Sequence, residues 1–229
     1  ARRQTLSPGE GKEFVRCAVG HDESLGRVLL LEGAAAGPGD LILCEDPLLV
    51  ADPRVTSGRL DEPEVVAAEL AKLNTRQREA LIDFESHLEQ VSEEQVARSI
   101  FDSDYAALLL FHRVMKCNSH AMANSDDGGR AALYCLGAKA SHDCSPSCEV
   151  RNIGGRLCFF ATRVLRDGEA LSSFYLRSHL AEARLWPTPR RRAALRQTKL
   201  FDCSCERCRS TDWCRAFACL RPACALTSR

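Results

Sequence analysis

The sequence predicts a globular α+β protein. Short strand-like runs occupy the first and last thirds of the chain, and a helical stretch separates them. The chain has 229 residues, 45% of them hydrophobic, which is enough for a core in one large domain or two small ones. The 31 basic and 31 acidic side chains cancel, so the overall charge does not indicate a nucleic-acid or membrane surface.

Strands are expected in both outer thirds. The runs 14–19, 27–31 and 41–45 are strand candidates because turn-forming residues separate them. Later, two alternating runs, 149–153 and 156–162, flank a Gly-Gly pair and predict a β-hairpin. The chain should then turn into a final apolar strand that ends at Tyr175.

The middle of the chain, 61–122, has a helical pattern. Asp61 followed by Pro63 predicts a capped helix start, and Ser92–Gln95 repeats the capping-box pattern. Between them, apolar residues at helical spacing share one face, so this helix should pack on the sheet. They are Leu81, Phe84, Leu88 and Val91. A further apolar helix is predicted over 105–115.

The run Arg190–Arg196 predicts a basic helix that follows Pro187 and Pro189. A solvated face is the expected role of such a run, and nuclear targeting or a histone-facing surface is the alternative. A zinc-containing nucleic-acid binder would also use these arginines, but the neutral net charge disfavours it.

Thirteen cysteines, an odd number in a chain with enough apolar residues for a core, favour reduced thiols over a disulfide framework. We therefore expect an intracellular location, in the cytoplasm, the nucleus or both. The N-terminus has no apolar signal-peptide core, and no run approaches membrane-spanning length. Because the chain lacks an initiator Met, we expect a fragment or a processed form.

The clearest metal signal is the C-x-C-x-x-C cluster of Cys203, Cys205 and Cys208. It brings three thiolates together, one short of the four that a structural zinc takes. Cys144 is a candidate for the fourth, because its proline-containing turn can project a thiol out of the sheet. A closed four-sulfur set leaves no position for water, so the zinc would be structural. Three further cysteines either form a second zinc site or are unpaired: Cys214, Cys219 and Cys224.

Three segments, Ala140–Cys148, Gly168–Tyr175 and Phe201–Cys208, resemble in this order the signature of the SET-domain protein methyltransferases. That family carries an Asn-His-x-Cys-x-Pro-Asn turn, a Gly-Glu-Glu-Leu-x-x-x-Tyr strand and a Cys-x-Cys-x-x-Cys tail. The segments Cys117–Ser119 and Leu133-Tyr134 make the SET-and-MYND subfamily the nearest resemblance. The cysteines of a MYND zinc finger are absent, so no MYND partner binding is expected.

The resemblance implies a SET-domain fold of small curved β-sheets with a helical insertion and a zinc-bound post-SET tail. It divides the chain into an N-terminal part of the SET domain (12–58) and a helical insertion (59–124). A C-terminal SET core (125–180) and a post-SET helix with a Cys-rich zinc-binding tail (181–229) follow.

The resemblance also implies S-adenosylmethionine (SAM) as cofactor, zinc as metal and Tyr175 as catalytic residue. The implied cofactor-binding residues are Gly26, Arg27, Asn118, Ser141, His142 and Phe201. The implied zinc ligands are Cys144, Cys203, Cys205 and Cys208. Structural alternatives stay open for single residues: Gly26 as a turn glycine, Asn118 as a helix C-cap, Tyr175 as a half-buried strand aromatic and Phe201 as a core residue.

The implied function is methyl transfer from SAM to a lysine side chain of a protein, histone or not. The partner would be a lysine-bearing protein or peptide such as a histone tail, with no membrane and no direct nucleic-acid contact. Departures from the family pattern favour an alternative, a catalytically weak SET-like, zinc-stabilised module that binds a peptide. They are Val28, Ser141, Ser147 and Lys199. Lys199 stands where many relatives have a second active-site tyrosine.

Overall fold

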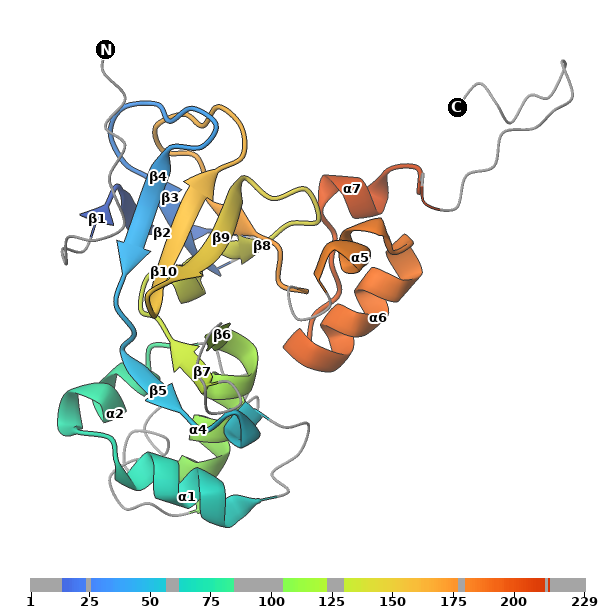
Figure 1. Cartoon of the computed structure of the whole chain (residues 1–229). Helices are drawn as coiled ribbons and strands as arrows, with labels where there is room; N and C mark the ends of the chain where they lie inside the picture. The colour runs from blue at the N-terminus through green and yellow to red at the C-terminus, as the bar shows by residue number, and fades with distance from the viewer. Residues whose placement is uncertain are drawn as a thin grey trace, which may run out of the picture.

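The computed structural model describes residues 14–23, 26–56, 62–84, 105–122, 130–176, 180–212 and 214. Within these ranges the strands form four small sheets, which confirms the predicted α+β class. The helices gather in two groups, one beneath the sheets and one beside them (Figure 1). No helix in these ranges has the length and hydropathy needed to cross a lipid bilayer.

The central sheet is antiparallel, with strands in the order β1-β4-β10-β9. These strands are β1 (Phe14–Val15), β4 (Leu41–Glu45), β10 (Arg156–Ala161) and β9 (Cys148–Ile153). The turn between β9 and β10 consists of Gly154 at φ 60° and Gly155 at φ 83°. A two-residue turn of this kind needs positive φ at both positions, which glycine adopts without strain. The predicted hairpin is confirmed.

A second hairpin pairs β2 (Cys17–Asp22) with β3 (Gly26–Leu31). The single strand predicted over 14–19 is therefore two strands. The backbone of Arg16 bonds to Ile42 on one side and to Glu32 on the other, so the chain changes sheets at this residue. Leu29 and Phe159 meet in the core that these two sheets share.

The first helical group packs on the three-stranded sheet β5-β7-β6 (Figure 1). The strands are β5 (Leu49–Ala51), β7 (Arg130–Leu133) and β6 (His120–Met122), and the helices are α1 (Pro63–Ala71), α2 (Thr75–Leu81) and α4 (Tyr105–Asn118). Leu81 and Phe84 are buried in the core shared with this sheet, as predicted, but α2 ends at Leu81, so Phe84 does not lie on the predicted helix. Leu88, Val91 and the Ser92 capping box lie outside the described residues.

Helix starts in this group differ from the prediction. The N-cap of α1 is Glu62, whose side chain makes no capping hydrogen bond, so the predicted Asp61 cap is wrong. Pro63 at the first position presets the helical φ and lacks an N–H that would need a partner. The capping box lies instead at α2, where Asn74 and Gln77 exchange side-chain and backbone hydrogen bonds of 3.0 Å.

The predicted strand ending at Tyr175 is wrong in its extent. Glu169 and Leu171 bond to the backbone of β3, and only β11 (Ser172–Ser173) then pairs, in parallel, with β8 (Ser141–His142). The segment thus changes partner halfway along, which prevents one continuous ladder. This crossing lays 171–176 beside 140–148.

A buried acid positions the turn before β8. Glu45, only 4% exposed, accepts hydrogen bonds from the backbone N–H groups of Leu136, at 3.0 Å, and Gly137, at 3.2 Å. These begin the 3-10 turn η2 (Gly137–Lys139) that leads into β8. Gly137 packs directly on the Leu157 side chain, and a Cβ there would lie 2.4 Å from Leu157 Cδ2.

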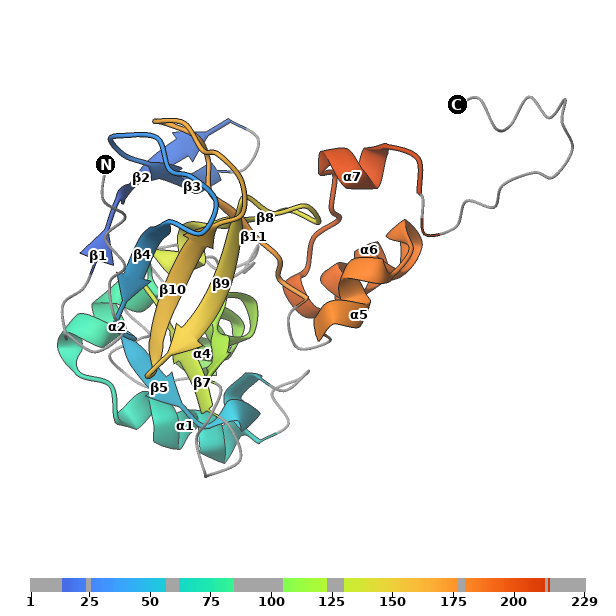
Figure 2. The ribbon, with the colours of Figure 1, turned by 45° about the horizontal axis from the view of Figure 1, so that its top comes forward.

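The second helical group consists of α5 (Leu180–Leu185), α6 (Thr188–Lys199) and α7 (Glu206–Arg209). It lies to one side of the sheets and contacts the β8–β9 turn in both views (Figures 1 and 2). Its core joins Ala183 and Leu195 to Phe174 and the cysteine cluster. The basic run 190–196 is helical, as predicted.

Candidate functional site

A cavity of about 270 Å³ is lined by the start of β3, the end of α4, η2 with β8, and the end of α6. Every residue predicted to bind the cofactor lies in this lining, together with Tyr175. The lining residues are Gly26, Arg27, Cys117, Asn118, Ala138, Lys139, Ser141, His142, Tyr175, Lys199 and Phe201. Segments from the beginning, middle and end of the sequence therefore meet at one hollow.

Tyr175 faces this cavity with its hydroxyl held in place. The hydroxyl donates to the carbonyl oxygen of Ala140 at 2.6 Å. The ring lies edge-on to Phe201, with 6.3 Å between ring centroids, and 5.2 Å from the His142 ring. Burial raises the pKa of Tyr175 well above its usual value, so the phenol stays protonated at neutral pH. The alternative of a half-buried aromatic with a bonded hydroxyl is also consistent with this geometry.

His142 connects Tyr175 to the cysteine cluster. The backbone N–H of Tyr175 donates to His142 Nδ1 at 3.1 Å, so a neutral ring carries its proton on Nε2. Nε2 lies 3.4 Å from the sulfur of Cys144, which assigns it as a donor to that sulfur. The His142 imidazole therefore lines the cavity and also contacts the sulfur cluster.

Three other predicted cofactor residues also have structural roles. Gly26 has φ 72°, and a Cβ there would meet nothing within 4 Å. Asn118 ends α4, and its Nδ2 donates to the Val114 carbonyl at 2.9 Å, so the helix-capping alternative and the place in the cavity both hold. Ser141 donates through its backbone N–H to Leu171 at 3.2 Å.

An acid that was not predicted joins two cations of the lining. Asp83 forms ion pairs with Arg27 and with Lys139, whose Nζ lies 3.2 Å from its second carboxylate oxygen. Lys139 also lies over the Phe84 ring at 4.7 Å. No sequence motif marks this group, because its members are far apart in the chain and only the tertiary structure brings Asp83, which follows α2, next to Arg27 and Lys139.

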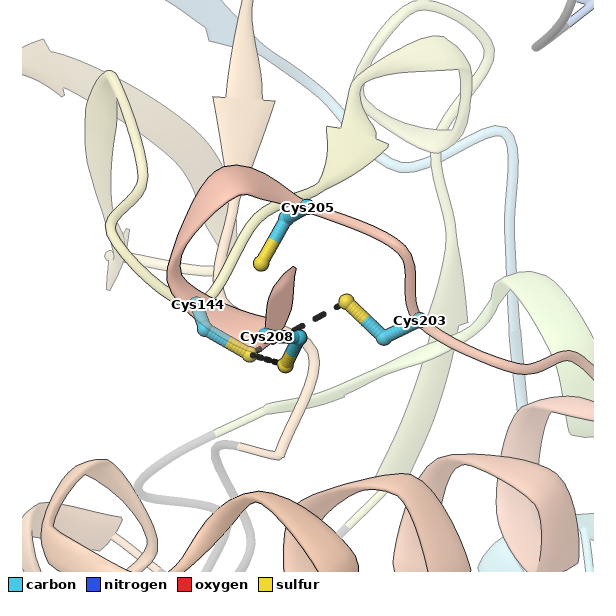
Figure 3. A group of neighbouring side chains, drawn as sticks. All are labelled: Cys144, Cys203, Cys205 and Cys208. Carbon is cyan, nitrogen blue, oxygen red and sulfur yellow. Dashed lines mark hydrogen bonds between the residues drawn. The ribbon is translucent and has the colours of Figure 1, made fainter. Parts of the chain in front are cut away.

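The four predicted metal ligands converge (Figure 3). The ligand atoms of Cys144, Cys203, Cys205 and Cys208 all lie within 4.8 Å of one another. Cys144 Sγ is 3.5 Å from Cys208 Sγ and 4.0 Å from Cys203 Sγ. Sulfurs bound tetrahedrally at about 2.3 Å from zinc lie roughly 3.8 Å apart, so the spacing fits that ion.

Contacts among the clustered sulfurs shift the pKa values of their thiols. The Cys144 thiol, the first of several donors, lowers the pKa of Cys203 to about 3. The same contact raises the pKa of Cys144, since one proton is shared between two sulfurs. Cys214 is exposed and is not among these four ligands; Cys219 and Cys224 lie outside the described residues.

The prediction of a solvated basic run holds in part: Arg190 and Arg196 are exposed, whereas Arg191 and Arg192 turn toward the cysteine cluster. Arg191 is 1% exposed, and its Nη2 donates to Cys208 Sγ at 3.4 Å and to Thr188 Oγ1 at 2.9 Å. Arg192 donates to the backbone carbonyls of Cys203 and Cys208. Arg191 faces inward because Cys208 Sγ and Thr188 Oγ1 accept hydrogen bonds from its buried guanidinium.

No protein-family model matches the chain. Over 97 residues, 42% of the chain, it is 31% identical to the histone-lysine N-methyltransferase SMYD3 of Mus musculus and likewise to that of Homo sapiens. The matched part spans about a fifth, 21%, of the length of these curated relatives. The chain is similar to the SET-domain lysine methyltransferases. This confirms the predicted resemblance.

Solved structures of SET proteins are also similar. CpSET8 from Cryptosporidium has 18% identity and a TM-score of 0.35, covering 69% of this chain and 56% of its own. Rubisco LSMT bound to sinefungin and monomethyllysine has 10% identity and a TM-score of 0.47, covering 83% and 52%.

Two departures from the SET pattern lie away from the cavity. Val28 is buried in the core and is not part of the lining. Ser147 exchanges hydrogen bonds with Ser172, including one of 2.7 Å from the Ser172 N–H to its Oγ, and so ties the two crossing segments together. The other two departures, Ser141 and Lys199, do line the cavity, and Lys199 brings an ammonium to it.

Proposed function

We propose that this chain carries the SET domain of a SAM-dependent protein-lysine methyltransferase. The observation that supports it best is the Tyr175 hydroxyl, bound to Ala140 and facing a cavity that all the predicted cofactor residues line. The similarity to curated lysine methyltransferases over 97 residues supports the same reaction.

The cavity suits the cofactor chemically. Phe201 and His142 offer aromatic faces for a purine ring, and the polar side chains of Asn118 and Ser141 line the same cavity, where they would bind the amino-acid end. SAM, when bound, supplies a methyl group on a sulfonium as the electrophile. The chain would hold donor and acceptor in line, and this alignment is the main contribution to the rate.

Tyr175 would act on the acceptor amine. A lysine side chain has a pKa of ~10.4 in water, and a narrow apolar channel lowers it, so that the proton can leave to water before methyl transfer. The Tyr175 hydroxyl and the Ala140 carbonyl would then orient the amine lone pair toward the methyl group. Because its raised pKa keeps Tyr175 protonated, it serves as a hydrogen-bonding group and not as a base.

Zinc would stabilise the fold and would take no part in catalysis. Cys144, Cys203, Cys205 and Cys208 fill four coordination positions and leave none for water. The ion would fix α6 and the tail against the β8–β9 turn, and with them Phe201 and His142. The many free cysteines suit a cytoplasmic or nuclear protein. The substrate would be a lysine-bearing protein, histones included.

Calorimetric titration with SAM, followed by labelled methyl transfer to a mixture of histones and peptides, tests the proposal. Tyr175→Phe should keep SAM binding and slow transfer by roughly 10²-fold or more. Tyr134→Phe is a matched control, because its hydroxyl bonds to Gly155 in the core, away from the cavity, and transfer should stay within about threefold.

One result would decide against the role of Tyr175, and another would decide against the enzyme. Transfer that is unaffected in Tyr175→Phe removes the catalytic assignment. SAM binding without any transfer supports instead the second candidate, a SET-like peptide-binding module, which the Lys199 ammonium in the cavity favours.

A further inference from the structure

Lys199, the last residue of α6, places its ammonium at the cavity wall. Nζ donates to the carbonyl oxygens of Cys117 at 2.8 Å and Lys116 at 3.3 Å, and it lies 5.8 Å from the centroid of the Tyr175 ring. An ammonium has three donors, and these two carbonyls occupy two of them. The third remains for a ligand.

Lys199 differs from the other cations of the lining in its charge balance. Arg27 and Lys139 share the carboxylate of Asp83. Among the residues that the structure describes, Lys199 has no ion pair, and no acid lines the cavity. Burial lowers the pKa of Lys199, which shows that its surroundings do not fully replace the water it has lost. An anion beside Nζ would supply the missing compensation.

The backbone at the end of α6 brings two different side chains to the cavity wall, which favours a ligand that contacts both. Leu200 has φ 64°, a left-handed conformation that ends α6. The reversal at this residue lets both Lys199 and Phe201 face the cavity. A ligand with an aromatic ring at one end and an anion at the other would contact both.

An S-adenosyl amino acid has this form, and its α-carboxylate is its one anionic group. We propose that Lys199 binds the α-carboxylate of the cofactor, with the nucleoside on the side of Phe201. This rests on the proposed function, because it takes SAM or its product as the ligand. A charge-assisted hydrogen bond from the Lys199 ammonium is stronger than one from a neutral donor and would fix the position of the amino-acid end.

A pair of ligands isolates this contact. S-Adenosylhomocysteine carries the carboxylate, and its decarboxylated analogue keeps the adenosine, thioether and amine but lacks it. Both are titrated into the whole chain and into Lys199→Met, which removes the charge at similar length. We expect Lys199→Met to weaken S-adenosylhomocysteine binding by about tenfold or more and to leave the analogue within about twofold.

Two further variants are compared. Lys199→Arg, which retains the charge, should restore most of the affinity for S-adenosylhomocysteine. Lys72→Met, which alters an exposed lysine at the C-cap of α1 paired with Glu69, should change the binding of neither ligand. Equal weakening of both ligands by Lys199→Met, or weakening of neither, overturns the carboxylate assignment while leaving the methyltransferase proposal intact. If the unaltered chain binds neither ligand, the proposed function itself fails, and this inference with it.

Discussion

Arg191 and Cys208 are in direct contact: Nη2 of the buried guanidinium lies 3.4 Å from the cysteine sulfur. The same side chain also donates to Thr188 and to the carbonyl of Trp186. A zinc ion with four thiolates carries a net charge of −2, and a buried cation beside it offsets part of that charge. Arg191 therefore joins the packing of α6 to the metal cluster.

Replacing this residue should weaken both folding and metal retention. Arg191→Met removes hydrogen bonds to charged and backbone groups, and we expect a loss of about 2–3 kcal/mol in the free energy of unfolding, measured by urea denaturation. Zinc affinity, measured by chelator competition, should fall by about tenfold. Arg190→Met is the control, because Arg190 is exposed over the Trp186 ring at 3.9 Å and should cost less than about 1 kcal/mol. An Arg191→Met protein with unchanged zinc affinity would refute the charge-balancing role.

Zinc content should depend on Cys144 although it lies far in sequence from the other ligands. Cys144→Ser should purify with one zinc equivalent fewer, counted by elemental analysis, and melt at least about 5 °C lower, because the tail loses its attachment to the β8–β9 turn. Cys135→Ser, an exposed cysteine outside the cluster, should retain full zinc content and melting temperature. Full metal content in Cys144→Ser would show that the three tail cysteines find a different fourth ligand.

Gly137 should tolerate no side chain. In Gly137→Ala the new Cβ would lie 2.4 Å from Leu157 Cδ2 and 3.2 Å from the Phe159 ring, so we expect a loss of about 1–3 kcal/mol in unfolding free energy. The matched change Gly37→Ala meets only the Asp40 carboxylate at 3.6 Å and should change stability by less than about 0.5 kcal/mol. Equal stabilities for the two variants would mean that η2 shifts away from β10 without cost.

Alkaline pH should destabilise the fold through its buried tyrosines. Burial raises the pKa of Tyr134 to about 12 and raises that of Tyr175 further, against a usual value of about 10. A raised folded-state pKa stabilises the protein fully below pH ~10, and this contribution is lost as pH rises through the folded value. Tyrosinate absorbance near 295 nm should therefore appear together with loss of far-UV circular dichroism. Tyr134→Phe should show a shallower loss of stability above pH ~10, and ionisation of more than one of the three tyrosines in a fully folded protein would contradict the burial of both phenols.

Local patterns predicted the elements whose residues act on near neighbours. The Gly154-Gly155 hairpin follows from the positive φ that its two-residue turn requires, whatever surrounds it. The final strand was mispredicted because local hydrophobicity does not reveal that Leu171 bonds to β3 and Ser172 to β8. The Asp61 cap was mispredicted because Pro63 fixes where α1 begins.

The sequence by itself determined the α+β class and named the side chains that gather at the cavity and at the sulfur cluster. Those residues lie in short motifs whose spacing encodes their chemistry, as in Cys203, Cys205 and Cys208. Only the tertiary structure decided how charge is balanced: Asp83 between two cations, Arg191 against the thiolates, and Lys199 without an acid among the described residues. Burial and pairing are properties of three-dimensional neighbours, and no local pattern along the chain specifies which distant group will compensate a charge.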